Sequence, residues 1–119
     1  MRVKIAVIAG RVMLAALFVL AGVSKLLRLG DIQEYIVGSS VLPAFLALPT
    51  ALLEIFGGLA LAFGLWPRII APVMTVFTLL TIVFFHNNLA DAQQLGLATK
   101  NLAIAGGLLM VYAQAETTR

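Results

Sequence analysis

Four long apolar stretches dominate this sequence and leave little chain outside them. They run over about residues 5–27, 42–65, 69–85 and 95–113. A bilayer has a hydrocarbon core about 30 Å thick, which an α-helix crosses with roughly 20 apolar residues. We therefore predict an all-α fold, an integral membrane four-helix transmembrane bundle, with residues 1–119 forming a single membrane domain.

The composition excludes a soluble enzyme. The 119 residues are 62% hydrophobic and only 11% charged, with 10 glycines in addition. Soluble domains are about 45–50% apolar, glycine included. Five acidic and eight basic residues cannot cover the surface of a small soluble domain. The segments between the apolar stretches are also too short to form a separate catalytic domain.

A short helix at the membrane surface is predicted between the first two spans, at about residues 32–37. Gly30 is expected to end the first helix, and Asp31 to act as an N-cap with Glu34 three residues later. Tyr35 is an aromatic residue suited to the level of the lipid headgroups.

Two prolines lie near the start of the second stretch. Pro43 suits the first turn of a helix, whereas Pro49 predicts either a kink or a helix that starts later.

The first stretch also has features of a signal peptide, since a basic start precedes an apolar run over residues 12–23. Arg11 and Lys25 bracket that run, and no clear cleavage site of small residues follows it. A transmembrane helix is therefore the preferred interpretation.

The distribution of lysine and arginine predicts the orientation in the membrane. With four spans, both termini lie on the same side. That side carries Arg2, Lys4, Arg68 and Arg119, with Arg11 added if its side chain reaches the surface; the other carries Lys25 and Arg28, with Lys100 at most. The excess of positive charge predicts cytoplasmic termini. The basic residues are scattered along the chain, so nucleic acid is not an expected partner.

Charged residues inside or at the edge of the spans indicate a candidate site, because an ionisable group in a membrane is costly and normally faces the protein interior. On an ideal helix, Arg11, Gly22 and Lys25 share one face with Ala15 and Phe18. Glu54 likewise shares a face with small residues on the second span. On the fourth span, Gly96, Lys100, Ala103 and Gly107 form one stripe. The glycines predicted to allow close helix packing are Gly22, Gly57, Gly58, Gly64, Gly106 and Gly107.

Depth suggests how these charges meet. Glu54 lies ten residues before Gly64, about 15 Å along a helix and therefore near the middle of the membrane. Lys25 or Lys100 is expected to lie beside Glu54 on one side and Arg11 on the other. His86 and Asn101 are expected at the mouth of this cluster.

Two interpretations of the cluster remain open. The charges either only fix the packing of the helices, or they also form a ligand or proton site. A metal site is not expected, because the chain has one histidine and no cysteine.

The spacing of these residues resembles the DoxX family of small bacterial four-helix membrane proteins. The resemblance begins with Arg11, Phe18, Gly22 and Lys25 on the first helix and continues with Val41-Leu-Pro43, where Ser40 replaces a common glycine. It then includes Glu54, Gly57, Gly58, Leu61, Gly64, Arg68, His86, Lys100-Asn101-Leu102 and Gly106-Gly107, and covers about residues 8–112.

The resemblance implies a protein of the bacterial inner membrane, associated with quinone-linked oxidoreductases and with oxidative or sulfur-compound stress. The polar stretch between His86 and Lys100 is short in this chain.

Three functions follow as expectations. The first is a membrane subunit of a redox complex that binds a quinone or a similar apolar molecule. Glu54 would hold a proton, and Lys25 and Lys100 would adjust the pKa of Glu54. No covalent cofactor is expected, and the expected partners are the lipid bilayer, redox-enzyme subunits and further copies of the chain. Catalysis by the chain alone is not expected, because it supplies no electron carrier.

The second expected function is that of a non-enzymatic scaffold or assembly factor. The third, a small transporter, is disfavoured because the chain lacks internal repeats.

Overall fold

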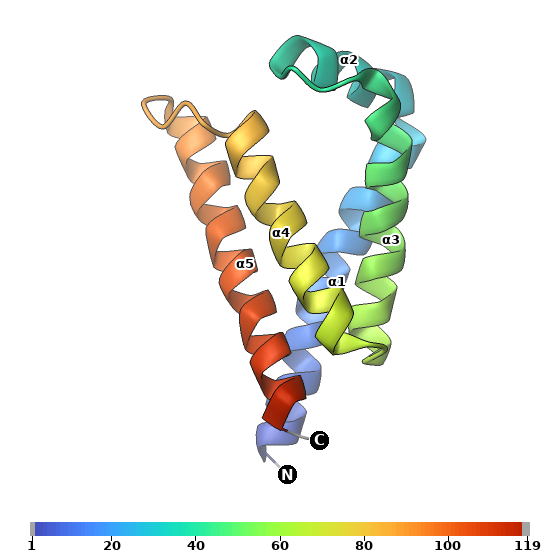
Figure 1. Ribbon diagram of the computed structural model, residues 1–119, viewed down its shortest axis with the longest axis vertical. Helices are drawn as coiled ribbons and strands as arrows, with labels where there is room; N and C mark the ends of the chain where they lie inside the picture. The colour runs from blue at the N-terminus through green and yellow to red at the C-terminus, as the bar shows by residue number, and fades with distance from the viewer. Residues whose placement is uncertain (1, 118–119) are drawn as a thin grey trace. The chain divides into compact units, whose positions relative to one another are not determined.

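Every regular element in the described part of the chain is a helix. The computed structural model describes residues 2–117, and the side chains of 3–116. The elements are α1 (Arg2–Leu27), α2 (Leu29–Ser39), the short 3₁₀ helix η1 (Ala44–Leu46), α3 (Ala47–Phe63), α4 (Pro67–Phe85) and α5 (Ala92–Thr117) (Figure 1).

Four segments in this range are long and apolar enough to span a membrane. They are Val3–Leu27, Ala44–Phe63, Pro67–Phe85 and Ala92–Glu116. The predicted fold class, an all-α membrane protein with four spanning helices and a short helix between the first two, is therefore confirmed. The assignment of residues 1–119 to a single domain stays a prediction.

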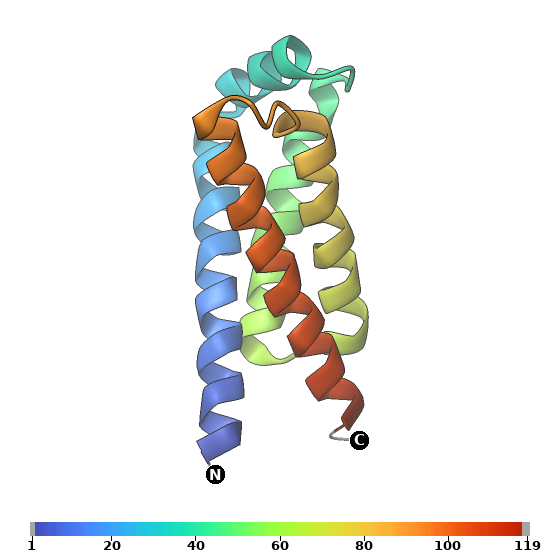
Figure 2. The same cartoon turned by 90° about the vertical axis from the view of Figure 1, so that its left-hand side faces the viewer.

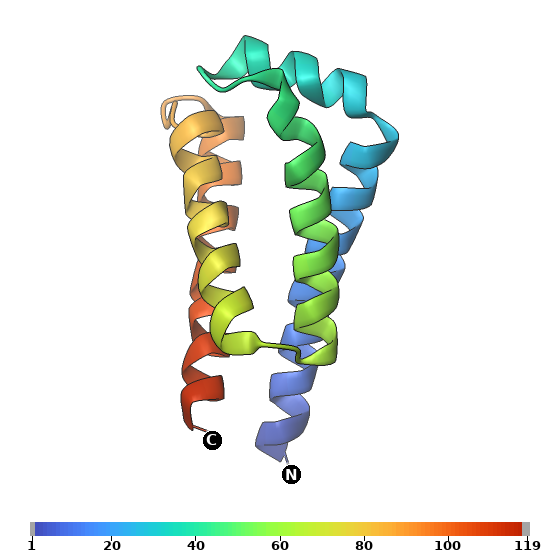
Figure 3. The same ribbon diagram turned by 45° about the vertical axis from the view of Figure 1, so that its right-hand side comes forward.

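The helices form two compact units, Met1–Leu65 and Trp66–Arg119, which we describe separately. In the first unit α1 packs along α3, and α2 crosses one end of this pair (Figure 3). In the second unit α4 packs along α5, and a short loop joins them at one end (Figure 2). Each unit is therefore an antiparallel pair of spanning helices.

Glycine brings the backbones of α1 and α3 into close contact. A Cβ atom added at Gly22 of α1 would lie 2.7 Å from the carbonyl oxygen of Ala51 in α3. A Cβ added at Gly58 of α3 would lie 3.2 Å from the carbonyl oxygen of Ala15 in α1. The two glycines therefore act reciprocally, since each lets the other helix approach its backbone.

The burial pattern matches the face predicted for α1. Ala15, Phe18 and Gly22 are buried, while Arg11 and Lys25 at the two ends of this face are half-buried. This periodicity of three and four residues places all five residues on the side of α1 that meets α3.

The boundary between α1 and α2 differs from the prediction. Gly30 lies inside α2 rather than at the end of α1, and Asp31 lies in the first turn of α2 rather than at its N-cap. The residue before α2 is Arg28, whose side chain makes no capping hydrogen bond. The acidic side chain of Asp31 still suits this position, because it lies close to the positive end of the helix dipole.

Pro49 marks a late helix start and not a kink. Pro43 precedes η1, and α3 begins at Ala47, so Pro49 lies in the first turn of α3. The first N–H groups of a helix have no intrahelical acceptor, so a proline costs little there.

The last helix starts earlier and presents a different face from the one predicted. The Oδ2 atom of Asp91 accepts a hydrogen bond of 3.2 Å from the backbone N–H of Gln94, so Asp91 caps the helix, which begins at Ala92 and not near residue 95. The buried residues of α5 are Ala98, Ala105 and Leu108, whereas the predicted stripe is exposed at Gly96, Lys100 and Ala103 and half-buried at Gly107. Helical phase alone could not show which of two small-residue faces packs.

Candidate functional site

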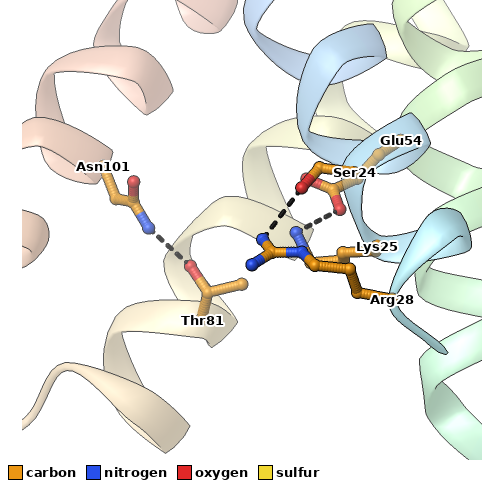
Figure 4. A network of polar contacts seen from close by, with 6 residues as sticks. All are labelled: Ser24, Lys25, Arg28, Glu54, Thr81 and Asn101. Carbon is orange, nitrogen blue, oxygen red and sulfur yellow. Dashed lines mark hydrogen bonds and ion pairs between the residues drawn. The ribbon is translucent and has the colours of Figure 1, made fainter. Parts of the chain in front are cut away.

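A carboxylate and an ammonium group form an ion pair inside the first unit. The Nζ atom of Lys25 lies 2.7 Å from Oε1 of Glu54, and the side chain of Glu54 is only 6% exposed while that of Lys25 is 28% exposed (Figure 4). Lys25 comes from the end of α1 and Glu54 from the middle of α3. The pair therefore joins a buried acid to a base that remains partly accessible.

Helix geometry explains why these two side chains meet. Side chains on a helix lean toward its N-terminus. Because α1 and α3 are antiparallel, Lys25 leans toward the centre of the pair, while Glu54 leans toward the end that carries Lys25. The close backbone contact at Gly22, one turn before Lys25, brings the two helices near enough for the ion pair.

Arg11 lies on the side of Glu54 away from Lys25, as predicted, but its guanidinium group is at Gly64, ten residues beyond Glu54 on the chain. The guanidinium group of Arg11 packs against Gly64, which follows α3 and has a left-handed φ of 69°. Both side chains lean toward the N-terminus of α1. Because Arg11 and Lys25 lie on opposite sides of Glu54, this lean brings Lys25 toward Glu54 and takes Arg11 away from it. The cation instead lies at the C-terminal end of α3, which the helix dipole makes favourable.

The turn at Gly64 satisfies the last carbonyl groups of α3 with backbone donors. The N–H of Leu65 donates to the carbonyl oxygen of Ala60 at 2.8 Å, and the N–H of Gly64 donates to that of Leu61 at 3.2 Å. These two bonds define a Schellman motif, in which glycine is the preferred left-handed residue. The turn therefore fixes the end of α3 against which Arg11 packs.

A second cation lies beside the Lys25–Glu54 pair and was not predicted as part of the site. Nη2 of Arg28 donates a hydrogen bond of 2.9 Å to Oγ of Ser24, and Figure 4 shows both residues next to Lys25. Ser24 and Arg28 are four residues apart, a spacing that places them on the same face of a helix. This spacing is the sequence signal that could have identified them.

The other predicted site residues lie in the second unit. Nδ2 of Asn101 on α5 donates a hydrogen bond of 2.8 Å to Oγ1 of Thr81 on α4 (Figure 4). His86 is half-buried directly after α4, and Lys100 is exposed on α5. The acceptor Thr81 was missed by the sequence reasoning, although Thr75, Thr78 and Thr81 recur at a helical spacing of three.

The environment of His86 favours its neutral form. Burial lowers the pKa of His86 below its ordinary value of 6.5, the backbone of Phe85 opposes this shift, and the positive charge of Lys100 adds to the lowering. Two of the three influences thus disfavour the imidazolium ion.

The predicted packing glycines differ in their surroundings. Gly22 and Gly58 lie at the contact between α1 and α3, and Gly64 lies under Arg11. Gly57 is buried and Gly107 half-buried. Gly106 is exposed, and a Cβ added there would meet no atom within 4 Å among the described residues.

The pair in the first unit places a buried acid next to an amine, whereas the Arg68–Glu116 pair of the second unit is exposed at 36% and 39%. Glu54 can hold or release a proton, and the Lys25 ammonium group offers three N–H donors, of which one is directed at Glu54. No group of three metal-ligating side chains occurs between residues 2 and 117.

Comparison with known proteins agrees with this architecture. The four candidate spans define a multi-pass membrane protein. The family model DoxX matches residues 6–87, so the chain belongs to the DoxX family. It is also similar to the inner membrane protein YqjF of Escherichia coli (strain K12), with 36% identity over 107 residues that cover 90% of this chain and 82% of that protein. These matches and the four spans support a multi-pass protein of the inner membrane. No solved structure matches the chain.

Proposed function

We propose that this protein binds an apolar small molecule of the quinone class at the Lys25–Glu54 pair, as the membrane component of a quinone-linked redox system. The observation that carries the proposal is the buried carboxylate of Glu54, 2.7 Å from a lysine that is 28% exposed. Replacing a buried ion pair by apolar residues is often neutral or stabilising. An ion pair buried between two membrane spans therefore suggests a role beyond packing.

The donors and acceptors of the pair fit a quinone. An ammonium N–H of Lys25 can donate to a carbonyl oxygen, and Glu54 can exchange a proton at the same place. A bound quinone would supply the capacity to carry two electrons and two protons. The electrons would come from a partner subunit, because the chain has no electron carrier of its own.

The test is the quinone content of the purified protein. We expect Glu54→Gln and Lys25→Met to lower the quinone extracted per protein by at least about tenfold, which corresponds to about 1.4 kcal/mol of binding free energy. Glu34→Gln, which removes an exposed carboxylate from α2, is the matched control and should retain the quinone. If all three variants and the unmodified protein carry equal amounts, the proposal fails.

A scaffold function is the second candidate, and the reciprocal contacts of Gly22 and Gly58 favour it. If the pair only fixes helix packing, the double variant Lys25→Met/Glu54→Gln should lose less stability than the sum of the losses in the two single variants. The free energy of unfolding in mixed micelles measures this coupling. Strong coupling with no bound quinone in any variant would favour the scaffold.

A further inference from the structure

Arg11 carries a positive charge that no acidic side chain of this protein is placed to balance. The five acidic residues are Asp31, Glu34, Glu54, Asp91 and Glu116. Glu54 pairs with Lys25, and Glu116 pairs with Arg68. Asp91 caps α5, and the two remaining acids lie on α2, which crosses the end of the α1–α3 pair opposite Arg11 (Figure 3). Within residues 3–116, Arg11 therefore has no carboxylate partner.

The guanidinium group of Arg11 is held against α3, yet its inner nitrogen has no acceptor. A Cβ atom added at Gly64 would lie 3.0 Å from Cζ of Arg11, so the group packs closely against the end of α3. The Nε atom of Arg11 is buried and has no hydrogen-bond partner among the described residues. A buried donor without an acceptor is costly, and so is a cation without an anion in a membrane protein. Both features indicate a partner that the chain itself does not supply.

The contact with Gly64 gives the level of this group in the membrane. Gly64 directly follows the candidate span Ala44–Phe63, which has 20 residues. A helix of this length crosses about 30 Å, the thickness of the hydrocarbon core. The guanidinium group therefore lies near the boundary between acyl chains and headgroups, where lipid phosphates are abundant. A planar guanidinium can donate two parallel hydrogen bonds to a phosphate.

From these observations we propose that Arg11 binds a phosphate group at the Gly64 end of the α1–α3 pair, and that an anionic membrane lipid supplies this group. The same chemistry occurs in inorganic phosphate, which the experiment below distinguishes from lipid. The site is separate from the Lys25–Glu54 pair, and the inference does not depend on the proposed function.

Phosphatidylglycerol and phosphatidylcholine of equal chain length test this selectivity. The first lipid has a net negative charge, whereas the choline cation of the second balances its phosphate. Native mass spectrometry of the purified protein in detergent follows the binding of each lipid. We expect phosphatidylglycerol to bind about tenfold more tightly, the size expected of one charge-assisted hydrogen bond. Arg11→Gln should reduce this preference to less than about twofold.

Lys4→Gln is the matched control, because it removes one exposed positive charge from the same end of α1. Lys4 precedes Arg11 by seven residues, so both lie on the same side of the helix. This variant should retain the preference for phosphatidylglycerol. An equal loss in the two variants would show a general attraction to positive charge and would overturn the inference. Equal affinity of the unmodified protein for the two lipids also overturns it, whether or not Arg11→Gln folds.

Inorganic phosphate distinguishes the two sources of the phosphate group. At constant ionic strength we expect phosphatidylglycerol to stay bound in millimolar inorganic phosphate, because a lipid already positioned in the micelle competes at high local concentration. A lipid that stays bound supports the lipid as the occupant. Displacement of the lipid would retain the phosphate site at Arg11 and overturn the lipid as its occupant.

Discussion

At the scale of single residues, the packing of α1 against α3 depends on the positions of glycines as much as on the positions of charged side chains. Gly22 and Gly58 let α1 and α3 approach to backbone contact, and this approach allows Lys25 to reach Glu54. Arg11 lies on the same face of α1 but leans the other way, toward Gly64. One face of α1 therefore contacts α3 at two separate places, at Glu54 through Lys25 and at Gly64 through Arg11.

We expect Gly22→Ala to destabilise the protein by about 2 kcal/mol. The added methyl group would lie 2.7 Å from both the carbonyl oxygen of Ala51 and a side-chain carbon of Ile55, so the helices must separate. Gly106→Ala is the control, since nothing described lies within 4 Å of the added atom. That change should be neutral or stabilise by about 0.5–1 kcal/mol, because alanine favours a helix over glycine. Unfolding in mixed micelles measures both variants, and equal effects would contradict the packing described for Gly22.

His86 predicts a pH dependence of stability. Its pKa in the folded protein lies below 6.5, so the unfolded chain binds more protons as the pH falls below 6.5. The free energy of unfolding should therefore decrease with acidification. His86→Asn removes this contribution and should give a shallower decrease over the same pH range. An identical slope in both proteins would show that His86 is equally protonated in the two states.

At the scale of helices, each unit is held together by a different kind of contact. In the first unit close backbone packing surrounds one ion pair. In the second unit, α4 and α5 are joined by the hydrogen bond between Asn101 and Thr81 and by the ion pair between Arg68 and Glu116. The sequence contains these polar residues, but their partners lie on the neighbouring helix and cannot be identified from the spacing along one helix.

Thr81→Val should weaken the contact between α4 and α5 by about 0.6 kcal/mol, a typical value for a hydrogen bond between membrane helices. The change leaves Nδ2 of Asn101 without its acceptor. Thr99→Val is the matched control, because the hydroxyl group of Thr99 donates only to carbonyl oxygens of its own helix, those of Leu95 and Gly96. Comparable losses in the two variants would argue against the contact between the helices.

At the scale of the whole molecule, the arrangement of charge predicts how the chain crosses the membrane. The described chain contains four candidate spans. The side that carries Arg2, Lys4 and Arg68 has the excess of basic residues, which predicts that this side is cytoplasmic.

The absence of cysteine from the sequence makes this orientation directly testable. Single variants Lys4→Cys and Asn88→Cys place one thiol near the N-terminus and one in the loop between α4 and α5. A maleimide that cannot cross the membrane should label Asn88→Cys in intact cells with a permeabilised outer membrane, and Lys4→Cys only after lysis. The opposite labelling pattern would reverse the predicted orientation.

The sequence by itself determined the fold class, the four spans and the buried face of α1, because the length and helical period of apolar segments follow from the thickness of a bilayer and the geometry of one helix. Only the tertiary structure decided that Lys25 pairs with Glu54, that Arg11 packs at Gly64, and that α5 packs through Ala98, Ala105 and Leu108. The physical reason is that these contacts depend on which helix packs beside a segment and on how closely that second helix approaches. Neither quantity is encoded in the periodicity of a single segment.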